Sequence, residues 1–230
     1  MTHAEQARLN DERRPYQWLY AKTNRDNRDE IHLLLYHLID VGAAAHAIWH
    51  SALAPSFRTH IATLLGTTPD EAGRFVAFMA ALHDLGKAGP TYQYKYSPPW
   101  LRERFAAIGL TEPGHYNYMT RTCPPATVTA WALPDLLVEY QSYAESFAHK
   151  VSLALGGHHG SWPGREAMEG IDDRQCPLWA EVRRELYEEV RAIFPPPPVT
   201  VQWTYPDLNI LLALLSGLVS CSRAPSPSSL

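Results

Sequence analysis

Three short stretches of the chain carry residue types that bind metal ions. The run His83–Lys87 places a histidine and an aspartate side by side at the end of an apolar segment, His158–His159 follow two glycines, and His37 lies earlier in the chain. Neutral imidazoles with a carboxylate suit Mn, Fe, Co, Ni or Zn, and without thiolates hydrolysis is the natural use of such a site. Together, the three stretches predict a metal-dependent hydrolytic site.

Each residue type predicts a different role at this site. Asp84 is expected to lie between two ions, because a carboxylate can bridge two metals and an imidazole cannot. His83 would bind one of the ions, and His37 and the pair His158–His159 would fill the remaining positions. Two ions about 4 Å apart would clamp a phosphate and activate water for in-line attack. Asp40, one helical turn from His37, is expected to orient the His37 ring.

These residues also have an interpretation without a metal. Taken alone, His37 fits a hydrogen-bonded core or surface histidine better than a ligand, and His158–His159 fit a surface turn as well as a ligand pair. Their joint occurrence with His83–Asp84 favours the metal site. The other histidines that we considered are expected to be structural or solvent-exposed: His32, His46, His50, His60 and His149.

Composition limits the class of protein. With 230 residues, 46% of them hydrophobic, the chain is long enough for one domain with a substantial core. Three widely spaced cysteines argue against a thiolate zinc site or a disulfide framework and fit a cytoplasmic protein. The net charge of −4 gives no general attraction to nucleic acid, so contact with DNA would need a local basic patch or delivery by a partner. The apolar run 208–219 is short and interrupted, and residues 1–10 lack a secretion signal, so no membrane association is expected.

The elements that must position these residues are mostly helices, because nearly every long segment has helical periodicity. The clearest start is Thr68-Pro69-Asp70-Glu71, which combines an N-cap, a proline at the first helical position and a capping box. Phe75, Met79 and Leu82 mark the buried face of this helix, and Gly86 is expected to end it in a left-handed conformation, with His83 and Asp84 in its last turn. The other expected helices cover about residues 30–50, 101–108, 127 onwards to a break or kink at Pro134, 143–155, 178–194 and 208–219.

The segments between these helices are expected to be irregular or extended. Residues 88–100 are rich in Pro and Tyr and predict a loop. Residues 199–205 alternate as in a strand, which makes them the single strand-like segment.

Three motifs, taken in order and spacing, resemble the HD nuclease domain of the CRISPR-associated nuclease-helicase of type I systems. They are His37-Leu-Ile-Asp-Val41, Ala81-Leu-His-Asp-Leu-Gly-Lys-Ala-Gly-Pro-Thr-Tyr-Gln93 and Leu155-Gly-Gly-His-His-Gly160. The resemblance covers roughly residues 32–219. It implies a mainly α, single-domain HD-type helical bundle with at most a short β element. We expect this domain over residues 1–222, with a polar lead-in at 1–29 and a disordered Ser/Pro tail at 223–230.

The resemblance also implies chemistry. It places metal ligands at His37, His83, Asp84 and His158–His159, and Lys87 near the phosphate, so that Asp84 and Lys87 are the expected catalytic residues. One or two ions of Mn, Co, Ni or Fe are expected, with Mg as a further candidate. The implied substrate is single-stranded DNA, exposed by an RNA-guided CRISPR surveillance complex. Because the sequence has no helicase-like segment, a separate helicase polypeptide is the expected partner.

The chain departs from the family pattern at two places. Pro124 and Pro125 stand where the family usually has a histidine, for which His115 is a candidate substitute, and Arg223 follows the last helix where the family has an aspartate. An arginine repels a metal ion and offers it no lone pair. Two alternatives to the nuclease therefore stay open. One is a degenerate HD domain that binds the surveillance complex or regulates the nuclease without cutting, and the other is an HD phosphohydrolase acting on nucleotides.

Overall fold

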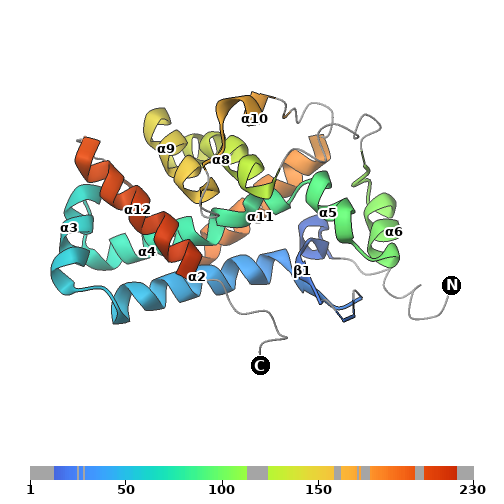
Figure 1. Cartoon of the computed structure of the whole chain (residues 1–230), viewed down its shortest axis with the longest axis horizontal. Coiled ribbons are helices and arrows are strands. Elements are labelled where there is room, and N and C mark those ends of the chain that lie inside the picture. Colours follow the sequence, from blue (N-terminus) through green and yellow to red (C-terminus); the bar gives the residue numbers. More distant parts are fainter. Residues whose placement is uncertain are drawn as a thin grey trace.

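A bundle of helices with one small sheet makes up the protein (Figure 1). The computed structural model describes residues 13–24, 26–27, 29–112, 124–157, 162–169, 171, 177–199 and 205–221. The elements are η1 (Pro15–Trp18), β1 (Tyr20–Thr23), β2 (Ile31–Leu33), α2 (Leu34–Ser51), α3 (Pro55–Leu65), α4 (Pro69–Ala81), η2 (Leu82–Lys87), α5 (Pro90–Tyr96), α6 (Pro99–Ala107), α8 (Pro125–Gln141), α9 (Glu145–Gly156), α10 (Arg165–Glu169), α11 (Pro177–Ile193) and α12 (Tyr205–Cys221). The mainly α class predicted from periodicity is confirmed.

Helix α4 lies at the centre of the bundle, where α2, α3, α11 and α12 all pack against it (Figure 1). It starts as predicted: the Thr68 hydroxyl accepts from the main-chain N–H of Glu71, and the Glu71 carboxylate accepts from that of Thr68. The predicted buried positions Phe75, Met79 and Leu82 have no exposed surface. A capped, buried helix thus forms a rigid support for the residues that follow it.

The chain leaves α4 through a tighter helix rather than a left-handed glycine. His83 and Asp84 lie in the 3₁₀ segment η2, inside which Asp84 departs from helical geometry with φ −109° and ψ 20°. Gly86 is not among the described glycines with positive φ, so the predicted left-handed stop was wrong. Gly86 is needed for a different reason: a Cβ there would overlap the Pro125 carbonyl oxygen and lie 2.5 Å from the Thr129 main-chain nitrogen.

Helix α8 supplies the surface against which η2 packs. It runs from Pro125 to Gln141 with Pro134 in its interior, so the helix continues past the predicted break. Leu133, Pro134 and Leu137 are buried, and α8 packs against both α9 and η2. We attribute the tolerance of Pro134 to this packing, which offsets the loss of one helical hydrogen bond.

Two segments form more structure than their sequences indicated. Antiparallel strands β1 and β2, which the periodicity missed, pair Tyr20 with Leu33 and Thr23 with Ile31. Part of the predicted polar lead-in belongs to the core, because Tyr16, Trp18, Leu19, Tyr20 and Ala21 are buried. The predicted loop 88–100 contains α5 and the start of α6.

The other predicted helix and strand boundaries differ by a few residues from those in the structure. Helix α2 begins at Leu34 because residues 31–33 pair in β2. The predicted strand 199–205 overlaps α12 at Tyr205, and its residues 200–204 lie outside the described residues, as does the predicted tail 223–230. On α11, the expected apolar side is buried at Trp179, Val182 and Leu186, but Ile193 is 43% exposed at the helix end.

The Gly86→Ala substitution is expected to lower the free energy of unfolding by about 3 kcal/mol or more, because the new methyl group meets main-chain atoms that cannot rotate away. Urea denaturation would measure the loss. The control is Gly217→Ala in α12, where a Cβ meets nothing within 4 Å and the better helix former should stabilise by up to about 1 kcal/mol. Equal effects of the two substitutions would contradict this account of Gly86.

Candidate metal centre

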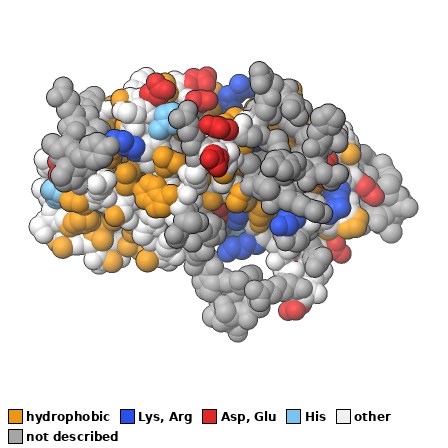
Figure 2. Space-filling model, turned by 45° about the horizontal axis from the view of Figure 1, so that its top comes forward, with side chains coloured by type: hydrophobic (Ala, Val, Ile, Leu, Met, Phe, Trp, Pro, Cys, Tyr) orange, Lys and Arg blue, Asp and Glu red, His pale blue; other side chains and the backbone are white. Residues whose placement is uncertain are grey.

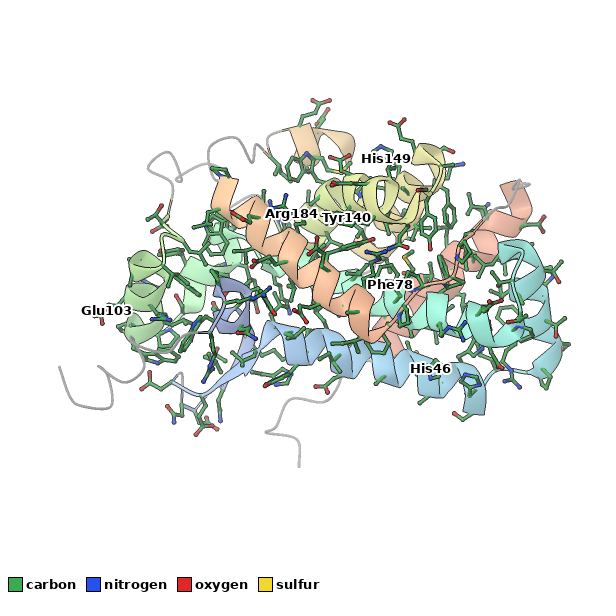
Figure 3. The ribbon with its side chains drawn as sticks, turned by 180° about the vertical axis from the view of Figure 1, so that it is seen from behind. His46, Phe78, Glu103, Tyr140, His149 and Arg184 are labelled. Carbon is green, nitrogen blue, oxygen red and sulfur yellow. The ribbon has the colours of Figure 1, made fainter. Side chains whose placement is uncertain are left out.

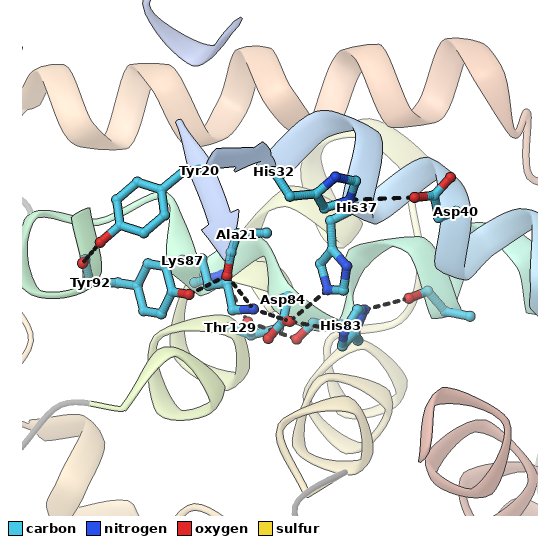
Figure 4. Close-up of polar contacts among 12 residues, drawn as sticks. Tyr20, Ala21, His32, His37, Asp40, His83, Asp84, Lys87, Tyr92 and Thr129 are labelled. Atoms are coloured by element: carbon cyan, nitrogen blue, oxygen red, sulfur yellow. Dashed lines mark hydrogen bonds and ion pairs between the residues drawn. The ribbon is translucent and has the colours of Figure 1, made fainter. Parts of the chain in front are cut away.

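Three of the predicted ligands meet in the interior, at the junction of α2 and η2 (Figure 4). His37 projects from the first half of α2, and His83 and Asp84 are adjacent in η2. One donor atom from each lies within 4.8 Å of the other two, and all three residues are buried. Among the described residues, no other group of three His, Cys, Asp or Glu side chains has this arrangement.

A single oxygen of Asp84 is the centre of the cluster. Asp84 Oδ2 lies 3.1 Å from His37 Nε2, 3.0 Å from His83 Nε2 and 2.8 Å from Lys87 Nζ. Burial by itself would raise the pKa of Asp84, but His83, His37 and Lys87 outweigh burial and hold the pKa well below its ordinary value of 3.8. The carboxylate is therefore ionised and is available as a ligand at neutral pH.

The orientation of His83 leaves a nitrogen for a metal. Its Nδ1 lies 2.9 Å from the Ala80 carbonyl oxygen, and because a carbonyl only accepts, Nδ1 carries the proton. In the neutral ring, the Nε2 lone pair then faces Asp84 Oδ2 at 3.0 Å. Two electron-rich atoms this close need a proton or a cation between them. The arrangement thus matches a ligand pair whose outer nitrogen is fixed by the main chain.

Burial keeps the His37 imidazole unprotonated. Burial lowers the pKa of its imidazole to about 4, against the opposing hydrogen bond to Asp84. An unprotonated imidazole keeps a lone pair to share with a metal ion. The donor set of two imidazoles and one ionised carboxylate fits a divalent transition metal.

Lys87 is held against the same carboxylate by its surroundings. Its ammonium donates to the Ala21 carbonyl oxygen at 3.2 Å and lies 5.2 Å from the centre of the Tyr92 ring. The Tyr92 hydroxyl also donates to the Ala21 carbonyl, so strand β1 anchors both side chains (Figure 4). Lys87 is 12% exposed, so its charge is directed inward, to Asp84.

Two polar side chains fix the path of η2. The Thr129 hydroxyl of α8 accepts from the Gly86 N–H at 2.8 Å and donates to the His83 carbonyl at 3.1 Å. The Gln93 amide donates to the Lys87 and Tyr20 carbonyls, both at 2.8 Å, and accepts from the Tyr20 N–H at 3.1 Å. Both side chains have no exposed surface, so these bonds are protected from water. The sequence predicted no role for either residue, because most of their partners lie more than 40 residues away in the chain.

Other predicted site residues lie elsewhere or outside the described part of the chain. Asp40 is exposed, and its carboxylate lies 3.4 Å from His32 Nε2, so the expected contact with His37 is replaced by one with His32. Helix α2 turns Asp40 toward solvent while His37 faces inward. His158, His159, His115 and Arg223 lie outside the described residues. Helix α9, which ends at Gly156, two positions before His158, does pack against η2.

The metal-free protein is expected to lose stability between about pH 6.5 and pH 4 through His37. Its folded pKa of about 4 is below the ordinary 6.5, so the unfolded chain binds more protons in this window and stability falls as the pH falls. The full loss is about 3 kcal/mol, at about 1.4 kcal/mol for each pKa unit. The stability that ionised Asp84 contributes is fully present above its ordinary pKa of 3.8 and is lost only at lower pH, so it does not affect this window.

Urea titrations with a chelator, at several pH values, would measure this loss in the native chain and in His37→Gln. The variant should lack the His37 part of the pH dependence, whatever its overall stability. Parallel curves for the two proteins would show that His37 does not titrate in this way.

The chain is similar to known proteins along most of its length. Residues 20–222 match the family described as Cas3, HD domain. The CRISPR-associated endonuclease/helicase Cas3 of Thermus thermophilus is 32% identical over 176 residues, which are 75% of this chain and 18% of that protein. The protein of the same name from Escherichia coli is 26% identical over 225 residues, 85% of this chain and 24% of that protein. The chain thus spans less than a quarter of each of these relatives.

Solved structures agree with the fold. A crystal structure of a CRISPR-associated protein matches with a TM-score of 0.77 at 25% identity, over 96% of this chain and 23% of the other. The Thermus thermophilus Cas3 HD domain, crystallised in the presence of Ni²⁺, matches with a TM-score of 0.66 at 26% identity, over 91% of this chain and 76% of the other. A chain of a CRISPR RNA-guided surveillance complex, pre-nicking, matches with a TM-score of 0.68 at 26% identity, over 88% and 24%. From the match over residues 20–222, with the fold and the His–Asp cluster that accompany it, the chain belongs to the Cas3 HD domain family.

Proposed function

We propose that this chain is a metal-dependent nuclease domain that cuts single-stranded DNA in type I CRISPR interference. The observation that carries the proposal is the convergence of His37, His83 and Asp84 in the interior of a Cas3 HD family member. Two further findings support this function. The relatives are named endonuclease/helicase, and one similar structure is a CRISPR RNA-guided surveillance complex.

We assign the ligands from the geometry and from the order of the motifs. His37 Nε2, His83 Nε2 and the Asp84 carboxylate would hold the first ion, and His158 and His159 would complete the coordination. Mn, Co, Ni or Fe are the candidate ions, with Mg as a further candidate, and one or two ions would bind. When bound, such an ion polarises a phosphate and lowers the pKa of a coordinated water. The Ala80 carbonyl fixes the His83 ring, so that binding needs no reorientation of this ligand.

Lys87 has the position and charge to assist at the phosphate. Its ammonium compensates the Asp84 charge at 2.8 Å. Once the carboxylate shares its charge with an ion, the same ammonium can donate to a non-bridging phosphate oxygen, and the Tyr92 ring and the Ala21 carbonyl limit how far it can move. We assign Lys87 to stabilising the negative charge that develops on the phosphate during in-line attack.

Delivery of the DNA is assigned to other polypeptides. The net charge is −4, and on the face in Figure 2 both acidic and basic side chains are visible, so that no single sign dominates. Long-range attraction of DNA is therefore weak. We propose that a CRISPR surveillance complex exposes the strand and that helicase activity feeds it to the site. No helix in the described ranges has the length and apolar character to cross a membrane.

A second candidate function is binding without cleavage. Pro124 caps α8 and Pro125 is its first residue, so the helix start at which the family usually has a histidine offers no ligand. A site that lacks this ligand and has Arg223 at another family position could bind too few ions to cut. The chain would then act as a partner of the surveillance complex or of the nuclease.

Metal content tests the site without assuming a substrate. The protein as purified is expected to retain a transition metal, and Asp84→Asn should retain about tenfold less or lower, because it removes the charged ligand. Elemental analysis after gel filtration would measure both. His149→Ala is the control, since His149 is exposed and lies 3.8 Å from Glu145 on α9. Equal metal content in the native chain and Asp84→Asn would exclude the assigned centre.

Cleavage tests the activity. With Mn²⁺, Co²⁺ or Ni²⁺, the chain is expected to cut single-stranded DNA, Asp84→Ala should reduce the rate by about 100-fold or more, and His149→Ala should stay within about twofold. A labelled oligonucleotide on a denaturing gel is a sufficient assay. Intact DNA, together with Asp84-independent capture of the surveillance complex, would favour the binding function instead. Hydrolysis of free nucleotides without DNA cleavage would point to a phosphohydrolase.

A further inference from the structure

A second pair of histidines lies on α2, apart from the buried cluster. His46 and His50 are four residues apart in the helix, and their Nε2 atoms are 3.2 Å from each other. The two rings meet edge to face with centres 4.5 Å apart. The i, i+4 spacing puts both rings on one face of the helix, and His50 is exposed while His46 is half-buried.

The neighbouring helix α4 approaches α2 closely beside the pair. A Cβ at Gly73 would lie 2.8 Å from the Trp49 ring, which is too close, and 3.4 Å from His50 Nε2, which is an ordinary contact. Burial lowers the pKa of His46, and His50 and Arg74 lower it further, while Asp70 opposes them. Of the charged groups that face the pair, Asp70 would attract a cation, and Arg74, which would repel it, lies 3.8 Å from Glu71.

The spacing of the two nitrogens suits one ion. With metal–nitrogen bonds of about 2.1 Å, two Nε2 atoms 3.2 Å apart subtend an angle of about 100° at the metal. This is near the angle between neighbouring ligands in tetrahedral and octahedral complexes. Each ring would bind through Nε2 with its proton on Nδ1, so the ring that now donates through Nε2 would change tautomer, with no net loss of a proton.

The pair is separate from the buried centre. His46 lies nine positions after His37 (46 − 37 = 9) on the same helix, which is about 13 Å along the axis. In Figure 3, His46 lies near the end of α2 that faces α3. An ion at this position therefore shares no ligand with His37, His83 or Asp84.

We propose that His46 and His50 form a surface site for a borderline divalent cation such as Ni²⁺, Cu²⁺ or Zn²⁺. Two neutral imidazoles supply the first bonds, and the Asp70 carboxylate on α4 is positioned to attract the ion. The remaining positions are open to water. Imidazole ligands and the order of affinities among first-row metals favour these late ions over Mn²⁺ or Mg²⁺. The site does not depend on the proposed nuclease.

Calorimetric titration with Ni²⁺ alone tests the proposal on the untagged chain. The native protein is expected to bind one equivalent more than His50→Gln and one more than His46→Gln. His60→Gln is the matched control, since His60 is also an exposed helical histidine, on α3, and its replacement should leave the count unchanged. In the Asp84→Asn background, which lacks the buried ion, the Cu²⁺ complex should show an electron paramagnetic resonance signal with coupling to two nitrogens, and the added His50→Gln substitution should remove it.

The proposal is overturned if His50→Gln binds as many equivalents as the native chain, with equal affinity, or loses no more than His60→Gln. It is equally overturned if the two-nitrogen Cu²⁺ signal survives in the double variant Asp84→Asn, His50→Gln. The buried centre has its own readout, because its ion is lost with Asp84→Asn and kept in His50→Gln. Failure of one site can thus be told from failure of the other.

Discussion

The buried negative charge of Asp84 is the constraint on which the rest of the structure depends. A lone carboxylate removed from water would be costly, and its removal becomes tolerable only when partners surround it closely. Here one oxygen meets His37, His83 and Lys87 within 3.1 Å. Each partner comes from a helix that the core holds in place. The polar cluster therefore depends on the apolar packing. The packing excludes water, and the exclusion of water strengthens every electrostatic interaction of the Asp84 carboxylate.

The short 3₁₀ segment η2 brings these partners together, and several small features maintain it. Gly86 lets the α8 main chain approach, and the Thr129 hydroxyl binds the main chain on both sides of Asp84. Successive side chains point about 100° apart in an α-helix and about 120° apart in a 3₁₀ helix. His83 and Asp84 nevertheless meet at 3.0 Å, and Asp84, with φ −109° and ψ 20°, departs from helical geometry. The departure from regular helix thus lies at the proposed metal centre, directly after the buried central helix α4.

Local signals in the sequence predicted much of this. The capping box at Thr68 and the buried face of α4 follow from spacing within one helix. The joint placement of His37, His83 and Asp84 was expected from their residue types and from the resemblance of their motifs. The hairpin β1–β2 was missed because strands of three and four residues are too short for periodicity. The function of Gly86 was misread, and Thr129 went unnoticed, because both depend on contact between segments about 40 residues apart. Asp40 has the predicted spacing from His37, but its side chain is exposed, and its carboxylate lies 3.4 Å from His32 Nε2 instead.

The Gln93 amide has a practical consequence for anyone who divides the chain. It binds Tyr20 much as a neighbouring strand would, accepting from its N–H and donating to its carbonyl, and it also binds the Lys87 carbonyl. A recombinant fragment that begins after Thr23 would leave this amide without two of its three bonds and remove the carbonyl that holds Lys87. Such a fragment could fold and still misplace its lysine. Any shortened version should therefore keep the residues from Pro15 onward, including the buried Tyr16 and Trp18.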